Sequence, residues 1–171
     1  MTIYFGDGTN QATASGGKIL QVVGTTTTTT AAMTLSSETW TDVSGMSVTI
    51  TPSSSSNKIL VMCTLSGSPS GNYMGVRFMR GSTAIFIGGA ASGNRTNATG
   101  LMRVRGNVHQ STKFNHHGVD SPSTTSATTY KIQVNNLYQS DAFYFNQPSV
   151  YDDQPYTTYL SSSLTAMEVA A

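Results

Sequence analysis

Charged residues are scarce in this chain. Asp, Glu, Lys and Arg make up 10% of its 171 residues, whereas an average globular domain has about 25%. The formal net charge is +1, and Lys and Arg do not cluster, so the basic surface that a nucleic-acid partner requires is missing. The low net charge also argues against disorder, because disordered chains usually combine low hydrophobicity with high net charge. A folded protein with so few charges is expected to meet other protein, because charge is depleted from interface cores.

Cysteine and long apolar runs are equally rare. Cys63 is the single cysteine and is expected to be a small buried hydrophobic residue. A disulfide framework is therefore excluded, which fits synthesis in a reducing cytoplasm. No stretch reaches the roughly 20 apolar residues of a membrane span, and the N-terminus lacks the basic and apolar regions of a signal peptide. We expect no membrane insertion.

Residues of the kind that enzymes use are few. Asp152 and Asp153 form the one adjacent carboxylate pair, and a glycosidase needs two carboxylates about 5–9 Å apart across a cleft. The chain has no Gly-x-Ser-x-Gly motif, and its lone cysteine has no neighbouring histidine. We therefore expect no catalytic residues, no cofactor and no enzymatic activity.

Three histidines raise the question of a metal site. His109, His116 and His117 lie in one segment with Asp120. Adjacent residues on a strand point to opposite faces, so His116 and His117 cannot both bind one ion unless the segment forms a loop. We expect ordinary surface histidines and no metal, and an ion shared by histidines on a three-fold axis stays an open alternative.

The sequence does contain a recurring pattern, in which a short apolar run borders a string of Ser and Thr. These two residues make up roughly three residues in ten, far more than in an average domain. β-Branched and aromatic residues favour strands, and Ser, Gly, Pro and Asn favour turns. Many short strands at spacings near a dozen residues predict an all-β fold, a jelly-roll-like antiparallel β-sandwich. A helix over residues 165–171 stays open.

The predicted strands follow this pattern over most of the chain. Gly81-Ser82 is the best hairpin signal, and Ser44-Gly45 is expected to join another pair of strands. A long aromatic-rich loop is expected from Tyr138 to Tyr159. The strands are expected at 19–23, 40–43, 46–50, 59–65, 73–80, 83–87, 101–105, 111–114, 130–134 and 160–169.

Residues 1–17 differ from the rest and are predicted to be an attachment arm, followed by one β domain over residues 18–171. Ile3, Tyr4 and Phe5 form an apolar tip, and Asp7 lies in the Gly-Asp-Gly turn that follows. A small, polar and Gly-rich joint then precedes the first strand. We expect these four residues to mount the protein on a larger assembly.

The run from Ile59 to Cys63 is apolar at every position. One face of this strand is expected to fill the core, and the other to line a three-fold axis. Together with a family resemblance that implies a trimer, this pattern predicts a homotrimer, with Ile59, Val61 and Cys63 assigned to the trimer interface.

The Tyr138–Tyr159 segment has two interpretations. Tyr151, Asp152, Asp153 and Tyr156 offer aromatic faces and carboxylates that suit a carbohydrate ligand. Tyrosine is also enriched at protein interfaces, and packing of this loop or of a subunit boundary is the interpretation that we favour.

Taken in order, several segments resemble a known family. They are Phe5 to Gln11, Lys18 to Val23, Ser47 to Val61, Val76 to Ile85, Asp120 to Val134 and Leu164 to Val169. The chain resembles the small β domain of virion appendage proteins, such as tail fibres and head fibres, in tailed bacteriophages of aquatic bacteria, cyanophages especially. The resemblance implies a jelly-roll-like trimer on the phage particle, bound to other virion proteins and without catalytic residues. The alternative function is a lectin-like tip that recognises a host surface glycan.

Overall fold

The computed structural model describes residues 3–4, 10–11, 18–70, 73–89, 92–104, 109–150 and 152–171. Regular structure in these residues consists of β-strands paired antiparallel, and they contain no helix. The predicted all-β class is therefore confirmed. Residues near the C-terminus, where a helix stayed open, form strand β13 (Ser162–Val169).

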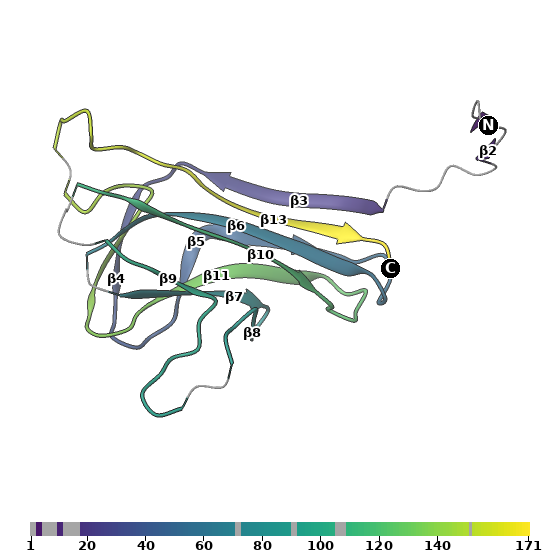
Figure 1. The fold of residues 1–171 in the computed structure, drawn as a ribbon, viewed down its shortest axis with the longest axis horizontal. Coiled ribbons are helices and arrows are strands. Elements are labelled where there is room, and N and C mark those ends of the chain that lie inside the picture. The colour runs from purple at the N-terminus through teal and green to yellow at the C-terminus, as the bar shows by residue number, and fades with distance from the viewer. Residues whose placement is uncertain are drawn as a thin grey trace.

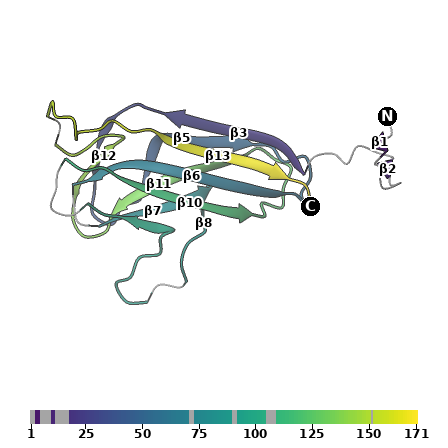
Figure 2. The same cartoon turned by 45° about the horizontal axis from the view of Figure 1, so that its top comes forward.

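The first main sheet has six strands built around the longest one, β6 (Lys58–Pro69). Strand β10 pairs with one edge of β6, while β13 and the shorter β12 share the other edge. Strand β3 extends the sheet beyond β13, and β4 extends it beyond β12. Figure 2 shows β3, β13, β6 and β10 running together as one layer. The added strands are β3 (Ile19–Thr27), β4 (Ala31–Leu35), β10 (Thr112–Asp120) and β12 (Asp141–Phe145).

The second main sheet has five strands, with β11 between β5 and β7. Two short strands, β8 and β9, pair with β7 at different positions along its length. Figure 1 shows this sheet on the opposite side of the core from β3 and β13. Its strands are β5 (Thr41–Ile50), β7 (Met74–Arg80), β8 (Thr83–Ile85), β9 (Gly100–Met102) and β11 (Thr128–Asn136).

The core lies between the two sheets and is filled by alternate residues of their strands, because successive side chains on a strand point to opposite faces. Tyr130, Ile132 and Val134 of β11 are fully buried, as their alternation with polar neighbours predicts. From the first sheet, Leu65 and Phe143 belong to the same buried cluster.

Two turn predictions had different outcomes. The hairpin at Gly81-Ser82 is confirmed, because β7 and β8 pair directly up to Arg80 and Thr83. The prediction of a turn at Ser44-Gly45 is wrong, because β5 runs continuously through both residues. Gly45 has φ +79°, and the pairing of β5 with β11 shifts register there. A bulge in one strand thus takes the place of a connection between two.

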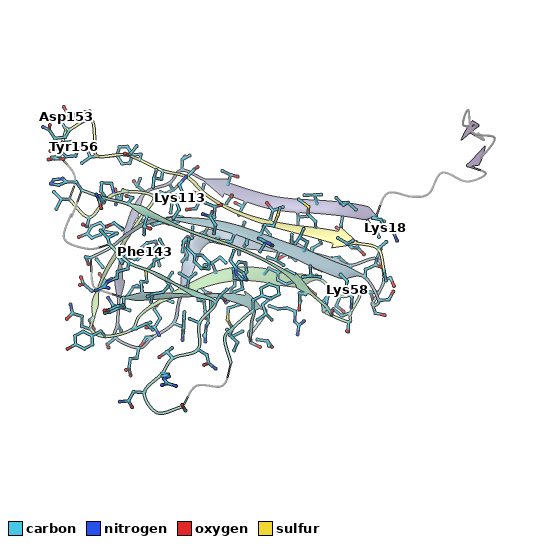
Figure 3. All side chains as sticks on the ribbon, viewed as in Figure 1. Lys18, Lys58, Lys113, Phe143, Asp153 and Tyr156 are labelled. Carbon is cyan, nitrogen blue, oxygen red and sulfur yellow. The ribbon has the colours of Figure 1, made fainter. Side chains whose placement is uncertain are left out.

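Apart from the loop between β8 and β9, which projects from the side of the domain (Figure 1), the loops that connect the strands gather at two opposite ends. At one end, the backbone N–H of Ala170 donates to the carbonyl of Lys18, 2.7 Å away. Figure 3 shows Lys18 and Lys58 at this end, and Asp153 and Tyr156 at the other. The strand β12 lies inside the segment that was expected to be one long loop, so Phe143 and Phe145 belong to the core.

Candidate functional site

The outer face of the first sheet carries an unbroken row of apolar side chains. Val22 lies opposite Met167, Met167 opposite Leu60, and Leu60 opposite Val119. The row therefore crosses β3, β13, β6 and β10, all facing away from the core. Val22 is 55% exposed and Val119 is 61% exposed, while the two residues between them are half-buried. Apolar side chains that align across four strands form a continuous surface.

Apolar residues next to this row widen the surface. Ile19 lies opposite Val169 toward one end of the strands, and Met62 lies on β6 toward the other. We call the seven residues the assembly face: Ile19, Val22, Leu60, Met62, Val119, Met167 and Val169. Their cross-strand neighbours on this face include hydroxyl side chains such as Thr165, and the exposed His117 opposite Met62. The ladders put no carboxylate beside these seven residues, since Glu168 points inward.

The predicted interface residues lie on the opposite side of the same strand. Ile59 and Val61 are 0% exposed and Cys63 is 5% exposed, all within the core of a single chain. Their assignment to a trimer interface is therefore corrected, because side chains enclosed in one chain cannot contact another. Burial also raises the pKa of the Cys63 thiol to about 12, so this cysteine stays protonated. Both sets of alternating residues in β6 are apolar, and the structure turns Leu60 and Met62 outward.

At the far end of the sheets, a histidine joins two residues of the predicted ligand loop. His109 Nδ1 lies 3.3 Å from Asp152 Oδ1, and the His109 ring contacts the Tyr156 ring edge-on at 5.4 Å between centroids. The Thr157 hydroxyl donates to the Asp152 carbonyl at 2.6 Å, which closes the turn locally. Tyr156 is 58% exposed and Asp153 is exposed as well. Tyr151 lies outside the described residues.

The histidines that were weighed as metal ligands do not converge on one point, although the rings of His116 and His117 lie 6.4 Å apart between centroids. His116 points inward against the rings of Phe78, Phe86 and Phe114, whereas His117 is exposed on the outer face. Burial, followed by the charge of His117, lowers the pKa of His116. In the part of the chain that the structure describes, no three His, Cys, Asp or Glu side chains are placed to hold a metal ion.

Two buried carboxylates are held by structural partners. Arg80 Nη1 donates to both oxygens of Asp120, at 2.9 and 3.0 Å, and the Tyr130 hydroxyl donates at 2.7 Å. Burial and this hydrogen bond raise the pKa of Tyr130. Arg80, Asp120 and Tyr130 thus hydrogen-bond to one another within the fold.

The second carboxylate, Glu168, fixes the Ser-rich turn after β5. It accepts hydrogen bonds from Gln21 and Asn57, both at 2.6 Å, and from the backbone N–H and hydroxyl of Ser53, both at 2.7 Å. Burial alone would raise the pKa of Glu168, but these donors outweigh it and lower the pKa to about 2. Glu168 is therefore an ionised anchor for the turn.

The arm residues are described only in part. Ile3–Tyr4 (β1) pairs antiparallel with Asn10–Gln11 (β2), and Figure 1 draws this pair away from the two main sheets, beyond the Lys18 end of β3. Phe5 and Asp7 lie outside the described residues. The attachment role of Ile3, Tyr4, Phe5 and Asp7 stays a prediction.

Sequence reasoning missed the assembly face as a set, although it singled out the strand at its centre. The available signal was that Leu60 and Met62 are apolar, because a strand with one buried face needs apolar residues only at alternate positions. Val119 and Met167 gave no signal, because nothing local shows that β10 and β13 flank β6.

Comparisons with known proteins give no further identification. No protein-family model and no curated protein matches the chain. Among the residues that the structure describes, there is no helix long and apolar enough to cross a membrane.

Proposed function

We propose that this chain is a non-enzymatic structural subunit of a bacteriophage virion, a homotrimeric fibre, knob or decoration protein with a jelly-roll-like domain. The observation that carries the proposal is the assembly face, an apolar surface made by four strands on the outside of a folded chain. Isolated exposed apolar residues are normal, whereas contiguous apolar patches mark interaction sites. Its low charge suits an interface core.

The occupant of the assembly face is a second copy of the same chain. The face has no carboxylate beside its seven residues, and Lys58, opposite Val169 at one end, is the one Lys, Arg, Asp or Glu among their cross-strand partners. The other partners are apolar residues, Thr165 and His117, so copies can meet along most of the face without like-charge repulsion. The side chains of this face are held by paired strands, so two copies can meet there without first ordering a loop. Three copies packed through this face place the outer side of β6 along the three-fold axis.

The arrangement of the two ends supports mounting on a larger particle. Strand β3 starts at the end where Lys18 and Ala170 meet, so the segment before residue 18 is joined to the domain at that end. The loop with Asp152 and Tyr156 lies at the opposite end (Figure 3). We infer that residues 1–17 attach the trimer to other virion proteins and that this loop points away from the particle.

The oligomeric state tests the proposal directly. Analytical ultracentrifugation at micromolar concentration should give a species of three times the 18.1 kDa chain mass. The double variant Val22→Asp, Val119→Asp should dissociate into folded monomers, because unpaired charges buried in an interface are strongly destabilising. Both side chains are more than half exposed in the single chain, so its fold should be kept.

A matched control separates the assembly face from exposed apolar residues in general. Leu101 on β9 is 50% exposed and belongs to the second sheet, so Leu101→Asp should leave the trimer intact. A wild-type chain that sediments as a monomer, or dissociation by Leu101→Asp as readily as by the double variant, would contradict the proposed assembly. Immunogold labelling of intact virions, with deletion of residues 1–17, then tests the particle and the arm.

The second candidate function is a lectin-like tip that recognises host glycan. The position of the loop at the end away from the arm favours it, since Tyr156 and Asp153 are exposed there. The double variant Tyr151→Ala, Tyr156→Ala distinguishes the two functions. Earlier melting or dissociation of the trimer indicates a structural loop, whereas unchanged melting with poor adsorption to host cells indicates a receptor-binding surface.

A further inference from the structure

A polar pocket opens at one end of the outer face of the second sheet, remote from the assembly face. Its volume is about 340 Å³, and part of its wall is the loop between β8 and β9, which projects from the domain in Figure 1. The pocket is lined by Glu38, Trp40, Gly93, Asn94, Arg95, Thr96 and Asn135. Three segments far apart in sequence therefore meet around one cavity.

The indole of Trp40 is held in place by the sheet beneath it. Gly75 lies beside the edge of the ring, and a Cβ at that position would come within 3.1 Å of Trp40 Cη2, so the missing side chain gives the indole its space. The Arg77 guanidinium lies over the ring, 4.3 Å from its centroid. Arg77 in turn donates to Gln133 Oε1 at 2.9 and 2.7 Å. The aromatic wall is therefore preorganised.

One polar atom beside this wall has no partner in the protein. Asn135 is 1% exposed, and its Oδ1 accepts no hydrogen bond from the residues that the structure describes. Buried polar atoms are almost always paired. Because Asn135 lines the pocket, a ligand hydroxyl or N–H group is the natural donor to this oxygen.

Two opposite charges line the same pocket without neutralising each other. Within the described residues, neither the Glu38 carboxylate nor the Arg95 guanidinium forms an ion pair. Glu38 has φ +57°, and its backbone N–H donates to the carbonyl of Asn136 at 2.9 Å. The chain thus holds an unfavoured backbone conformation at a residue that lines the cavity.

We propose that this pocket binds a neutral saccharide through a pyranose ring. Every sugar hydroxyl is both donor and acceptor, and the pocket offers both kinds of group in the amides of Asn94 and Asn135, the carboxylate of Glu38 and the guanidinium of Arg95. Arg77 covers one face of the Trp40 ring, so the apolar face of a pyranose would pack against the other face. Glu38 opposes an anionic ligand and Arg95 opposes a cationic one, so the balance favours a neutral ring. The inference does not depend on the oligomeric state or on the Tyr156 loop.

Trp40 makes the test specific, because it is the one tryptophan of the chain. The full chain is titrated with methyl pyranosides of glucose, galactose, mannose, fucose and N-acetylglucosamine. Binding is followed by tryptophan fluorescence and by the NMR signal of the indole N–H. We expect a saturable change with at least one of these glycosides, at the millimolar affinity typical of a small, open site.

Variants on the rim then assign the binding to this pocket. Arg95→Ala and Glu38→Gln change exposed side chains and should leave the circular dichroism spectrum and melting unchanged, while raising the Kd about tenfold or more. Asn135→Ala should also weaken binding, although its burial makes the exposed variants the primary measurement. Lys113→Ala changes an exposed residue of β10 on the other sheet, so it is the matched control and should keep the wild-type Kd.

Four outcomes would overturn the inference. One is the absence of any saturable change with all five glycosides, and another is a wild-type Kd in both Arg95→Ala and Glu38→Gln. The third is binding of glucuronate or N-acetylneuraminate when the neutral glycosides are inert, because that would indicate an anion site. Loss of binding in Tyr156→Ala alone would place the saccharide in the far loop and would also overturn the assignment.

Discussion

The outer faces of the two main sheets differ in whether their side chains have partners within the chain. On the second sheet, polar residues pair with one another: Lys131 donates to Asp42 at 2.7 Å and Gln133 donates to Asp42 at 2.6 Å. Gln133 also accepts from Arg77, which covers Trp40. On the first sheet, the corresponding row of Val22, Met167, Leu60 and Val119 is apolar, and both of its ends are more than half exposed. The polar side chains of the second sheet therefore have partners within the chain. The apolar side chains of the first sheet would lower the free energy by leaving water.

The difference shows that an uncharged surface is not uniform. Both faces are made of strands with the same alternation, and both have hydroxyl side chains. On the second face, the side chains of Lys131, Asp42, Gln133 and Arg77 form one polar ladder of hydrogen bonds. The hydrogen bond from Lys131 and the charge of Arg77 help to lower the pKa of Asp42. The first face has its apolar residues in register. Register across strands, more than composition, decides which face is suited to a partner.

The largest expected effect comes from truncating a side chain on the inner side of β6. Ile59→Ala should lower the free energy of unfolding by about 3 kcal/mol, because Ile59 is fully buried and the change leaves a cavity. Leu60→Ala, one residue away on the outer side, should weaken trimer formation and change the stability of the monomer much less. Chemical denaturation under dissociating conditions, paired with sedimentation, measures the two effects separately. Equal losses of monomer stability would mean that the two sides of β6 are not distinct.

An effect of intermediate size is expected from acid, which should lower the free energy of unfolding by protonating the buried Glu168. The outer faces of the two sheets should not contribute to this effect. Glu168 has a pKa of about 2 in the folded state, below its ordinary value of 4.5. A depressed carboxyl pKa stabilises the fold above the unfolded pKa, so this contribution is lost as the pH falls from about 4.5 toward 2.

Melting temperature against pH should accordingly decline less steeply over this range in Glu168→Gln than in the wild type. The matched control is Asp42→Asn on the second outer face, which keeps Glu168 and should keep most of the acid dependence. An unchanged acid profile in Glu168→Gln would show that the turn after β5 is not anchored by this carboxylate.

The smallest effect is expected on the polar ladder itself. Asp42→Ala removes an exposed ion pair with Lys131, and such pairs contribute about 0.2–1 kcal/mol. The trimer should persist, because this face lies away from the assembly face. Thermal melting and sedimentation of the same sample provide the measurement, and dissociation of Asp42→Ala would mean that the second sheet takes part in assembly.

Local patterns predicted the strands well where polar and apolar residues alternate. Tyr130, Ile132 and Val134 alternate with Lys131 and Gln133, and the structure buries the first set. The same reasoning cannot orient β6, because Ile59 and Val61 are no more apolar than Leu60 and Met62. Only the neighbouring strands decide which set lies inside, and the sequence does not show which strands these are.

The remaining differences have the same non-local origin. The strand β4 follows a threonine string, and β12 is a short strand inside an aromatic-rich segment, so neither stands out from its surroundings. The pocket around Trp40 combines the turn at Glu38, the loop at Arg95 and the middle of the chain at Asn135. Such a site exists only after the strands have paired, and no spacing in the sequence indicates it.

The hydrogen bond between Ala170 and Lys18 has a consequence for how the chain tolerates rearrangement. Because these residues meet across a single 2.7 Å contact, a short peptide linker can join them without disturbing either β3 or β13. New termini can then be opened at Gly81-Ser82, which is an exposed two-residue turn, and exposed turns are the sites where circular permutation is best tolerated. A permuted protein built in this way should fold, and it would display any sequence fused to its new ends beside β8 in place of the original end of the sheets.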